Sequence, residues 1–194
     1  MPGSTRKTKS LLFATSNPGK LLEARTILAS FEIGVERIDA KGIEIQADTT
    51  GEVASFASRA ASRELNKPVM VEDAGLFVDA LGGFPGVYSA YAFKTIGPIG
   101  ILALLEGKPR GARFVSSAAY CEPAGEPRVF DGSARGKIAE NPMGSGGFGF
   151  DPIFIPHGSE FTFAQLSLEE KSRVSHRADA LRKFGRWYSA AAEK

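Results

Sequence analysis

Two adjacent carboxylates, Glu72 and Asp73, are the residues of this sequence best suited to metal-assisted chemistry. They follow the apolar run at residues 69–71, which predicts a strand that ends there, and open α/β sheets bind ligands at the carboxyl ends of strands. Carboxylate oxygens suit Mg²⁺, which commonly binds one or two of them together with waters and substrate phosphates. Glu44, in an earlier strand-like stretch, is a candidate second carboxylate. From these residues alone, a solvated turn is an equal alternative, because Asp-Ala-Gly is also good turn chemistry.

A second candidate is the small-residue loop Thr-Ser-Asn-Pro-Gly-Lys at residues 15–20, between an apolar run and a segment with helical spacing of apolar residues. The N-terminus of a helix offers free N–H groups and a positive dipole end to anions. The loop therefore suits a triphosphate, although it lacks the Walker A pattern and Asn-Pro-Gly is more often only a capped turn. The candidate contacts are Thr15, Ser16, Asn17, Pro18, Gly19 and Lys20.

Aromatic and basic residues near the C-terminus form two further candidates. Phe148 and Phe150 are separated by Gly149 and followed by Asp151, a pattern that lets a flat nucleobase approach the backbone, although core packing is the alternative. Downstream, Lys171, Ser175, His176 and Arg177 lie within seven residues. On one continuous helix they diverge. If the helix breaks and restarts with Ser175 as its cap, all four address one ligand.

These candidates are connected by alternating strands and helices and, later, by a hairpin. That order predicts an α/β domain with a mixed sheet. The predicted elements are strands at 11–15, 35–45 and 69–71, helices from 20, at 49–65, at 98–106 and from 167, a rigid loop at 82–86 and a hairpin at 112–139.

Composition limits the classes of protein to which the chain can belong. With 43% hydrophobic and 24% charged residues, its 194 residues suit one domain, which we place at residues 10–194 after a disordered basic leader at 1–9. No apolar run approaches the roughly 18 residues of a membrane span, and we find no signal peptide. The net charge of +2 gives no nucleic-acid footprint. The single cysteine, Cys121, favours a reducing, cytoplasmic location.

Taken together and in this order, the candidate segments resemble the inosine triphosphate pyrophosphatase family, house-cleaning enzymes for non-standard purine nucleotides. The resemblance rests on ATSNPGK (14–20) with Glu23, VEDAGLFVDALGGFPGVYSAY (71–91), GGFGFDPIFIP (146–156) and FAQLSLEEKSRVSHRADAL (163–181). It implies an elongated α/β domain whose mixed central sheet is flanked by helices, with two lobes around a nucleotide-binding cleft. It also implies a homodimer.

The resemblance implies a reaction as well: hydrolysis of ITP, dITP and XTP to the nucleoside monophosphate and pyrophosphate with Mg²⁺. In that reaction Asp73 is the general base and a metal ligand, Glu44 is the other metal carboxylate, and Lys20 neutralises charge that develops on the phosphates. Residues 15–20 hold the triphosphate. The other implied substrate contacts are Ala74, Phe148, Gly149, Phe150, Asp151, Lys171, His176 and Arg177.

The implied selectivity has a physical basis in the 6 position of the purine. Hypoxanthine and xanthine carry a carbonyl oxygen there, whereas adenine carries an amino group. Hydrogen-bond donors from Arg177 or from backbone N–H groups pair with the oxygen and reject adenine. Three departures from the family pattern bear on this selectivity: Gln165 replaces glutamate, Phe150 replaces tyrosine or tryptophan, and Tyr91 replaces a bacterial arginine whose charge Lys94 can supply.

Two other functions fit parts of the same pattern. A pyrophosphatase that prefers modified pyrimidine nucleotides would share the metal site and the triphosphate loop, and a panel of substrates separates it from a purine enzyme. A nucleotide-binding or RNA-binding module would bind without turnover and would be indifferent to Asp73→Asn. The intact acids and the absence of a basic stripe argue against such a module.

Overall fold

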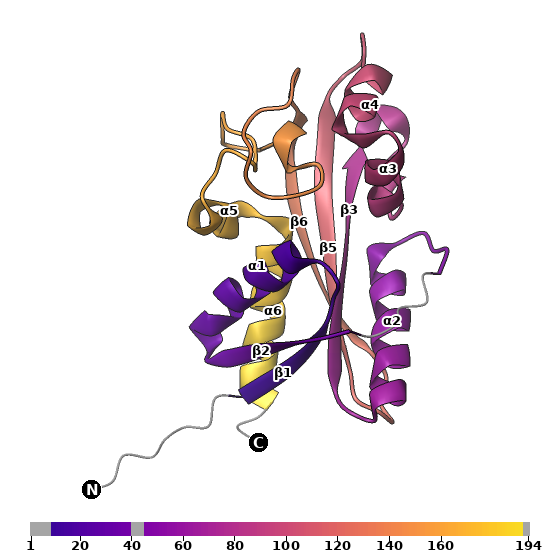
Figure 1. The fold of residues 1–194 in the computed structure, drawn as a ribbon, viewed down its shortest axis with the longest axis vertical. Coiled ribbons are helices and arrows are strands. Elements are labelled where there is room, and N and C mark those ends of the chain that lie inside the picture. Colours follow the sequence, from indigo (N-terminus) through magenta and orange to yellow (C-terminus); the bar gives the residue numbers. More distant parts are fainter. Residues whose placement is uncertain (1–8, 40–44, 192–194) are drawn as a thin grey trace, which may run out of the picture.

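The computed structural model describes residues 9–39 and 45–191, which form a seven-stranded mixed sheet within an elongated molecule (Figure 1). The strands are β1 Lys9–Ala14, β2 Ile33–Ile38, β3 Val69–Val78, β4 Pro85–Gly86, β5 Gly111–Cys121, β6 Arg128–Ile138 and β7 Phe154–Pro156. Their order is β2-β1-β3-β5-β6-β7, and β4 pairs with β3 outside this path. β1 runs parallel to β2 and β3, and all other pairs are antiparallel. The predicted fold class is confirmed.

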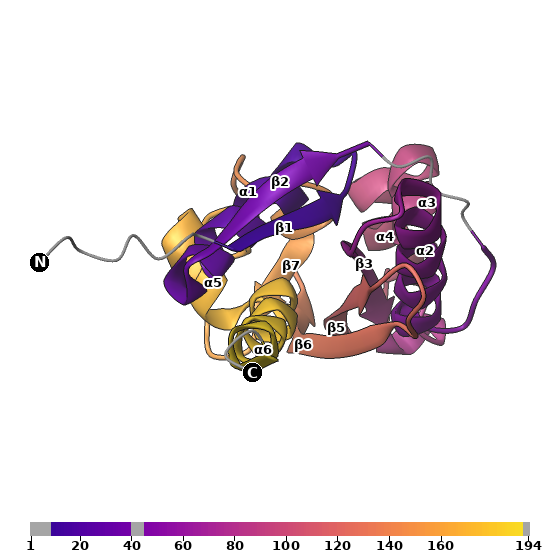
Figure 2. The same cartoon turned by 90° about the horizontal axis from the view of Figure 1, so that it is seen from below.

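Helices cover both faces of the long β5–β6 hairpin. They are α1 Pro18–Leu28, α2 Thr50–Leu65, α3 Ser89–Thr95, α4 Gly97–Leu104, α5 Leu168–Val174 and α6 His176–Ala191, with single 3-10 turns η1 Ala29–Phe31, η2 Asp79–Leu81 and η3 Asp151–Ile153. Seen from below, the hairpin lies between α6 and α2 (Figure 2), and both helices pack on it. In the described part of the chain, no helix combines the length and the apolar character that crossing a membrane requires.

Two hydrophobic cores divide the molecule along the length of its sheet. The first core lies between α1, α6 and the strands around β1, and includes Leu11, Phe13, Leu28, Met70, Leu181 and Phe184. The second core lies at the other end of β3 and β5, and includes Leu76, Ile101, Phe114, Ile153, Phe154 and Phe163. Since β3, β5 and β6 contribute to both cores, the lobes share one continuous sheet.

Local capping chemistry starts the helices that carry the candidate residues. Asn17 precedes α1 and accepts hydrogen bonds on Oδ1 from the N–H groups of Gly19 and Lys20, at 2.8 and 3.2 Å. Thr49 with Glu52 and Ser167 with Glu170 form reciprocal capping boxes at α2 and α5. Such caps stabilise a helix start by about 1 kcal/mol each. The predicted starts of α2 and α5 are confirmed, and α1 begins two residues earlier than predicted.

One edge of β3 lacks a neighbouring strand over a few residues, and this gap positions the site. β1 pairs with β3 only as far as Val71, and β4 begins to pair with it at Leu76. The other edge of β3 is paired with β5 throughout. The backbone from Glu72 to Gly75 is therefore open on the side between the two lobes.

Several predicted boundaries are wrong for physical reasons. The strand predicted at 69–71 continues to Val78, because β5 pairs with all of it and buries polar side chains that resemble a turn in sequence. The strand predicted at 35–45 is Ile33–Ile38, paired with β1 along its whole length. The helix predicted at 98–106 is preceded by the short helix α3, whose small and aromatic residues give no clear period. The hairpin is confirmed, and of the predicted leader only Lys9, which opens β1, is described.

Gly132 in β6 allows α6 to approach the sheet closely. A Cβ atom there would lie 2.2 Å from the carbonyl oxygen of His176 and 2.3 Å from the amide nitrogen of Ala180. We expect Gly132→Ala to lower the free energy of unfolding by about 1–3 kcal/mol, since helix backbone cannot move aside cheaply. Urea denaturation measures the change. Gly125→Ala, in the open hairpin turn, is the control, and equal midpoints for the two variants would contradict the close-approach argument.

Candidate functional site

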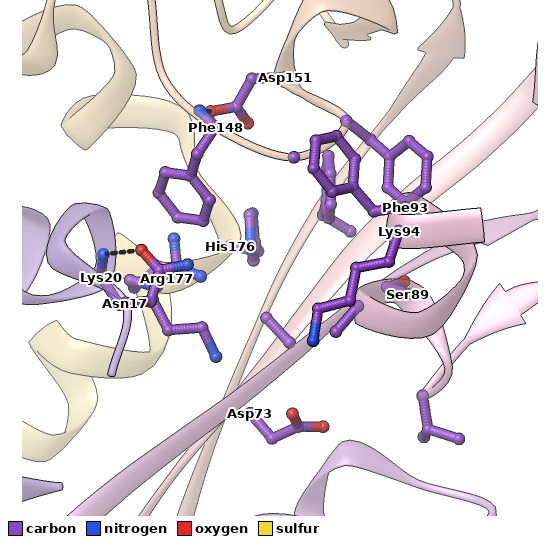
Figure 3. A pocket seen from close by; sticks show the side chains of 16 residues that line it. Asn17, Lys20, Asp73, Ser89, Phe93, Lys94, Phe148, Asp151, His176 and Arg177 are labelled. Atoms are coloured by element: carbon purple, nitrogen blue, oxygen red, sulfur yellow. Dashed lines mark hydrogen bonds between the residues drawn. The ribbon is translucent and has the colours of Figure 1, made fainter. Parts of the chain in front are cut away.

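A cleft of about 300 Å³ lies between the two lobes, at the open edge of β3 (Figure 3). Its walls come from the start of α1, from β3, α3 and β5, from the segment at 148–151 and from the start of α6. The predicted residues that line it are Asn17, Lys20, Asp73, Ala74, Phe148, Gly149, Phe150, Asp151, His176 and Arg177. Segments that are far apart in the sequence thus meet at one cavity.

Other predicted residues lie elsewhere. Thr15, Ser16, Pro18, Gly19 and Lys171 are described but do not line the cleft. Glu44 lies outside the described residues. Gly19 contacts the site indirectly, because a Cβ atom there would lie 2.4 Å from the Phe148 ring. The substrate and metal roles of all these residues stay predictions.

Backbone N–H groups in and after the loop before α1 donate hydrogen bonds to oxygens of the same loop. Asn17 Oδ1 accepts from Gly19 and Lys20, the Leu21 N–H donates to the Asn17 carbonyl, and Thr15 Oγ1 accepts from the Asn17 N–H. These donors are satisfied within the loop, so the N-terminus of α1 is a capped helix end. What the loop presents to the cleft is the side chains of Asn17 and Lys20.

Strand alternation sends the two adjacent acids to opposite faces of the sheet. Glu72 points toward α6, is 4% exposed and accepts a hydrogen bond from Ser116 at 2.5 Å. Asp73 pairs across the sheet with Ser117, which hydrogen-bonds to Thr50 at the start of α2 at 2.7 Å. Asp73 lines the cleft and Glu72 does not. The two acids have different environments because both lie inside β3, where neighbouring side chains point to opposite faces of the sheet.

Lys20 bridges the open edge of β3. Its Nζ lies 2.9 Å from the Glu72 backbone oxygen and 2.9 Å from Glu72 Oε2. The ammonium thus satisfies a carbonyl that would otherwise face the gap, and it pairs with a buried carboxylate. Lys20 is therefore held at the cleft by Glu72.

A network of buried charges joins three helices and β3 beneath the cleft. Arg177 Nη1 lies 2.7 Å from Glu23 Oε2, and its Nε lies 3.1 Å from Glu72 Oε1. Lys171 Nζ lies 2.7 Å from Glu23 Oε1 and 2.6 Å from Asp151 Oδ2. All these side chains are nearly or fully buried, so each charge depends on its partners. The sequence gives no sign that Glu23, on α1, pairs with Lys171 of α5 and Arg177 of α6.

The network sets the protonation of its members. Burial alone would raise the pKa of Glu72, but the charges of Arg177 and Lys20 outweigh it and lower that pKa to about 2. The pKa of Glu23 is also lowered, since Arg177 and Lys171 outweigh its burial. His176 is fully buried, and burial followed by the charge of Arg177 holds its pKa well below its usual value. The cleft therefore contains a neutral imidazole beside a cationic guanidinium.

Aromatic rings line the end of the cleft that is formed by the 148–151 segment. The Phe148 ring has Lys171 Nζ at 5.0 Å and the Arg177 guanidinium at 5.2 Å from its centroid. His176 stacks on Phe114, with centroids 4.5 Å apart and planes 9° apart. Within the described residues, His176 Nδ1 is buried without a hydrogen-bond partner. This end therefore combines flat apolar surfaces with a buried ring nitrogen that has no hydrogen-bond partner among the described residues.

The helix break at Ser175, one of two possibilities left open by the sequence, is confirmed. α5 ends at Val174, and the Ser175 hydroxyl accepts from the Ala178 N–H at 3.2 Å at the start of α6. The break directs His176 and Arg177 to the cleft, while Lys171 binds the buried carboxylates. Of the four residues, His176 and Arg177 line the cleft, and whether all four address one ligand stays a prediction.

α3 and β5 supply cleft residues that the sequence analysis did not assign to the site. They include Ser89, Phe93, Lys94 and Phe114. Tyr91, where bacterial members carry arginine, is 70% exposed and does not line the cleft. Phe150 is buried and meets Phe93 edge to face, which suits a ring without a polar tip. The sequence does not mark Phe114 as a site residue, because an aromatic residue in a strand usually belongs to the hydrophobic core.

The fold and the cleft together define an α/β protein whose continuous mixed sheet carries a ligand cleft with aromatic, cationic and carboxylate walls. The sequence model of the Ham1 family matches residues 11–187. The chain belongs to the Ham1 family.

Known proteins with similar sequences and structures span nearly the whole chain. A dITP/XTP pyrophosphatase from Methanopyrus kandleri is 54% identical over 92% of this chain and 95% of its own, and one from Thermococcus kodakarensis is 52% identical over 91% and 96%. The Staphylococcus aureus Ham1 protein superimposes with a TM-score of 0.81 at 35% identity, over 96% of this chain and 100% of its own. A HAM1 protein from Coxiella burnetii gives 0.83 at 28% identity, over 94% and 99%.

Proposed function

We propose that this chain hydrolyses dITP, ITP and XTP to the nucleoside monophosphate and pyrophosphate, which removes non-standard purine nucleotides from the pool. The observation that carries the proposal is the 54% identity to a dITP/XTP pyrophosphatase over 92% of the chain. The cleft supports it, because aromatic rings lie at one end and Lys20 and Asp73 at the other. A purine and a triphosphate need these two environments side by side.

Recognition of the purine is proposed for the aromatic end. Phe148, Gly149, Phe150 and Asp151 form one wall for the base, and a planar ring can stack there. Arg177 uses Nε and Nη1 for Glu72 and Glu23, and among the described residues its Nη2 has no hydrogen-bond partner. A donor fixed in that way favours a 6-carbonyl oxygen over the amino group of adenine.

Asp73 is proposed as the general base. Its carboxylate lines the cleft, as does Ala74, which we assign to substrate contact. A water oxygen attacks the α-phosphorus, the bond from that phosphorus to the bridging oxygen of the β-phosphate breaks, and the water's proton passes to the Asp73 carboxylate. Lys20 holds positive charge near the phosphates as pyrophosphate leaves.

The donor set at Asp73 fits magnesium. Within residues 9–39 and 45–191, no three acidic, histidine or cysteine residues cluster as a complete cage. Magnesium commonly takes only one or two carboxylates and completes its shell with waters and phosphates, which suits Asp73. Glu44 is proposed as the second carboxylate. Six residues after it, Thr50 hydrogen-bonds to Ser117, which pairs with Asp73 across the sheet. When bound, the ion supplies charge neutralisation on the phosphates.

The remaining predicted contacts divide into two kinds. We propose that Thr15, Ser16, Pro18 and Gly19 shape the loop that presents Asn17 and Lys20 to the triphosphate. Lys171 is proposed to act from beneath the site, where it binds Asp151 and Glu23. His176 is proposed to contact the base directly.

Pyrophosphate release tests the function. ITP, dITP, XTP, ATP, GTP and a modified pyrimidine triphosphate are each offered with Mg²⁺ and with EDTA. We expect turnover of the first three with Mg²⁺ and loss of turnover in EDTA. Equal rates with ATP and ITP would exclude the proposed selectivity, and preference for the pyrimidine would favour the other enzyme considered above.

A homodimer is proposed from the apolar surface beside α3. Phe84, Tyr88 and Tyr91 are 40%, 47% and 70% exposed, and Ile99 on α4 is 65% exposed. Exposed apolar patches of this kind mark interaction surfaces. Sedimentation equilibrium checks the proposal, and a monomer at micromolar concentration would contradict it.

A cytoplasmic location is proposed from the single cysteine. Cys121 is a buried free thiol, which suits a reducing compartment. Cell fractionation with an antibody to the protein checks this, and recovery from a secreted fraction would contradict it.

A further inference from the structure

We propose that Lys94 binds the β- or γ-phosphate of the bound triphosphate and holds the pyrophosphate as it leaves. This inference rests on the proposed function, because it assigns a residue to the same substrate. It adds a phosphate ligand from α3, on the wall opposite the loop at residues 15–20 (Figure 3).

The charges around the cleft single out this lysine. Within residues 9–39 and 45–191, three cations line the cleft: Lys20, Lys94 and Arg177. Lys20 is paired with Glu72, and Arg177 is paired with Glu72 and Glu23. Across the part of the chain that the structure describes, Lys94 forms no ion pair or side-chain hydrogen bond. Among the described cations of the cleft, Lys94 is therefore the one whose charge no carboxylate offsets, whereas buried carboxylates partly offset the charges of Lys20 and Arg177.

The backbone beneath Lys94 is well anchored. At the start of α3, the buried Ser89 hydroxyl accepts from the Leu76 N–H at 2.8 Å and donates to the Gly86 carbonyl at 2.7 Å. Ala92 is buried in the second core. Next to the lysine, Phe93 meets Phe150 edge to face with ring centroids 5.7 Å apart. These contacts fix the helix while the lysine side chain itself is exposed.

The direction of the side chain indicates which part of a nucleotide it contacts. Figure 3 shows the Lys94 ammonium pointing into the cleft on the side of Asp73, away from Asp151 and the aromatic end. A mobile ammonium acts on phosphates as a point charge and needs no fixed geometry. When the bond between the α and β phosphates breaks, charge increases on the leaving pyrophosphate, and a cation there stabilises the transition state. Lys94 is thus placed for the phosphates and not for the base.

Titration with the two products tests this without turnover. Isothermal titration calorimetry with Mg²⁺ present measures the binding of inorganic pyrophosphate and of IMP to the full chain and to Lys94→Ala, Lys94→Arg and Lys108→Ala. We expect Lys94→Ala to weaken pyrophosphate binding on the order of tenfold and IMP binding less than about twofold, as expected for one lost charge-assisted contact. Lys94→Arg should restore most of the affinity. Lys108, an exposed lysine outside the cleft, is the matched control.

The outcomes separate this inference from the proposed function. Unchanged pyrophosphate affinity in Lys94→Ala, or an equal loss for IMP and pyrophosphate, overturns the role of Lys94. A wild-type chain that binds no pyrophosphate overturns it as well. A wild-type chain that binds pyrophosphate through Lys94 yet releases none from ITP overturns the proposed function and leaves the phosphate site standing.

Discussion

Replacement of Asp73 by asparagine is expected to reduce kcat for ITP by about 10²–10⁴-fold, because the proposed proton acceptor is removed while the shape of the side chain is kept. Asparagine cannot take a proton from the attacking water. It also binds magnesium less well than a carboxylate does, so the loss should be at the upper end of this range. Pyrophosphate release at saturating ITP and Mg²⁺ measures the effect.

Binding measurements distinguish this chemical role from a structural one. Asp73 lines the cleft but belongs to neither hydrophobic core, so IMP binding and the melting temperature should change little. Asp79→Asn is the matched control, since Asp79 follows the same strand and lies on the surface beside Arg113. Full turnover in Asp73→Asn would show that another group activates the water.

Replacement of Arg177 by methionine is expected to destabilise the fold by about 3–5 kcal/mol, the usual cost of removing one partner from a buried ion pair. The change leaves Glu23 and Glu72 buried with less compensating charge. Lys171 and Lys20 remain, but each already pairs with one of these carboxylates. Thermal unfolding measures the loss, and the melting temperature should fall by about 6–20 °C for a domain of this size.

A surface ion pair and a charge rescue test the reason for this loss. Arg173→Met removes an exposed arginine that pairs with Glu169, and it should cost at most about 0.5 kcal/mol. If uncompensated charge causes the loss in Arg177→Met, adding Glu23→Gln and Glu72→Gln should recover part of the stability. Further destabilisation by these two changes would mean that lost packing, and not charge, dominates.

The same network predicts how stability depends on pH. The pKa of Glu72 is lowered to about 2 in the folded protein, from an ordinary value of 4.5. Because the folded pKa is the lower one, the stabilisation from Glu72 is complete above pH 4.5 and is lost as the pH falls toward 2. The loss should reach roughly 3 kcal/mol, since one pKa unit corresponds to about 1.4 kcal/mol. Urea unfolding between these pH values should show a shallower decline for Glu72→Gln, and parallel curves would contradict the assignment.

Elements with short-range signals could be predicted from the sequence. The starts of α2 and α5 follow from capping boxes, whose two residues lie three positions apart. The β5–β6 hairpin follows from its turn at residues 122–127 between two extended runs. The sequence left a continuous helix and a break at Ser175 as alternatives, because the outcome depends on contacts with residues that are distant in the chain.

The acid pair shows where local reasoning stops. Glu72 and Asp73 resemble a turn after a short strand, but long-range pairing with β5 carries β3 onward to Val78. Strand alternation then separates the two acids. Glu72 becomes a buried partner of Lys20 and Arg177, while Asp73 faces the cleft.

The sequence by itself therefore determined the fold class, most helix and hairpin positions and the set of residues suited to nucleotide chemistry, since these depend on residue type and on short spacings. Only the tertiary structure decided which of those residues share a cavity. It showed that Lys171 and Glu72 stabilise the site from beneath, and that Lys94 faces the cleft without a partner among the described residues. The physical reason is that burial and ion pairing depend on neighbours distant in the chain, whose positions are fixed by sheet pairing and helix packing.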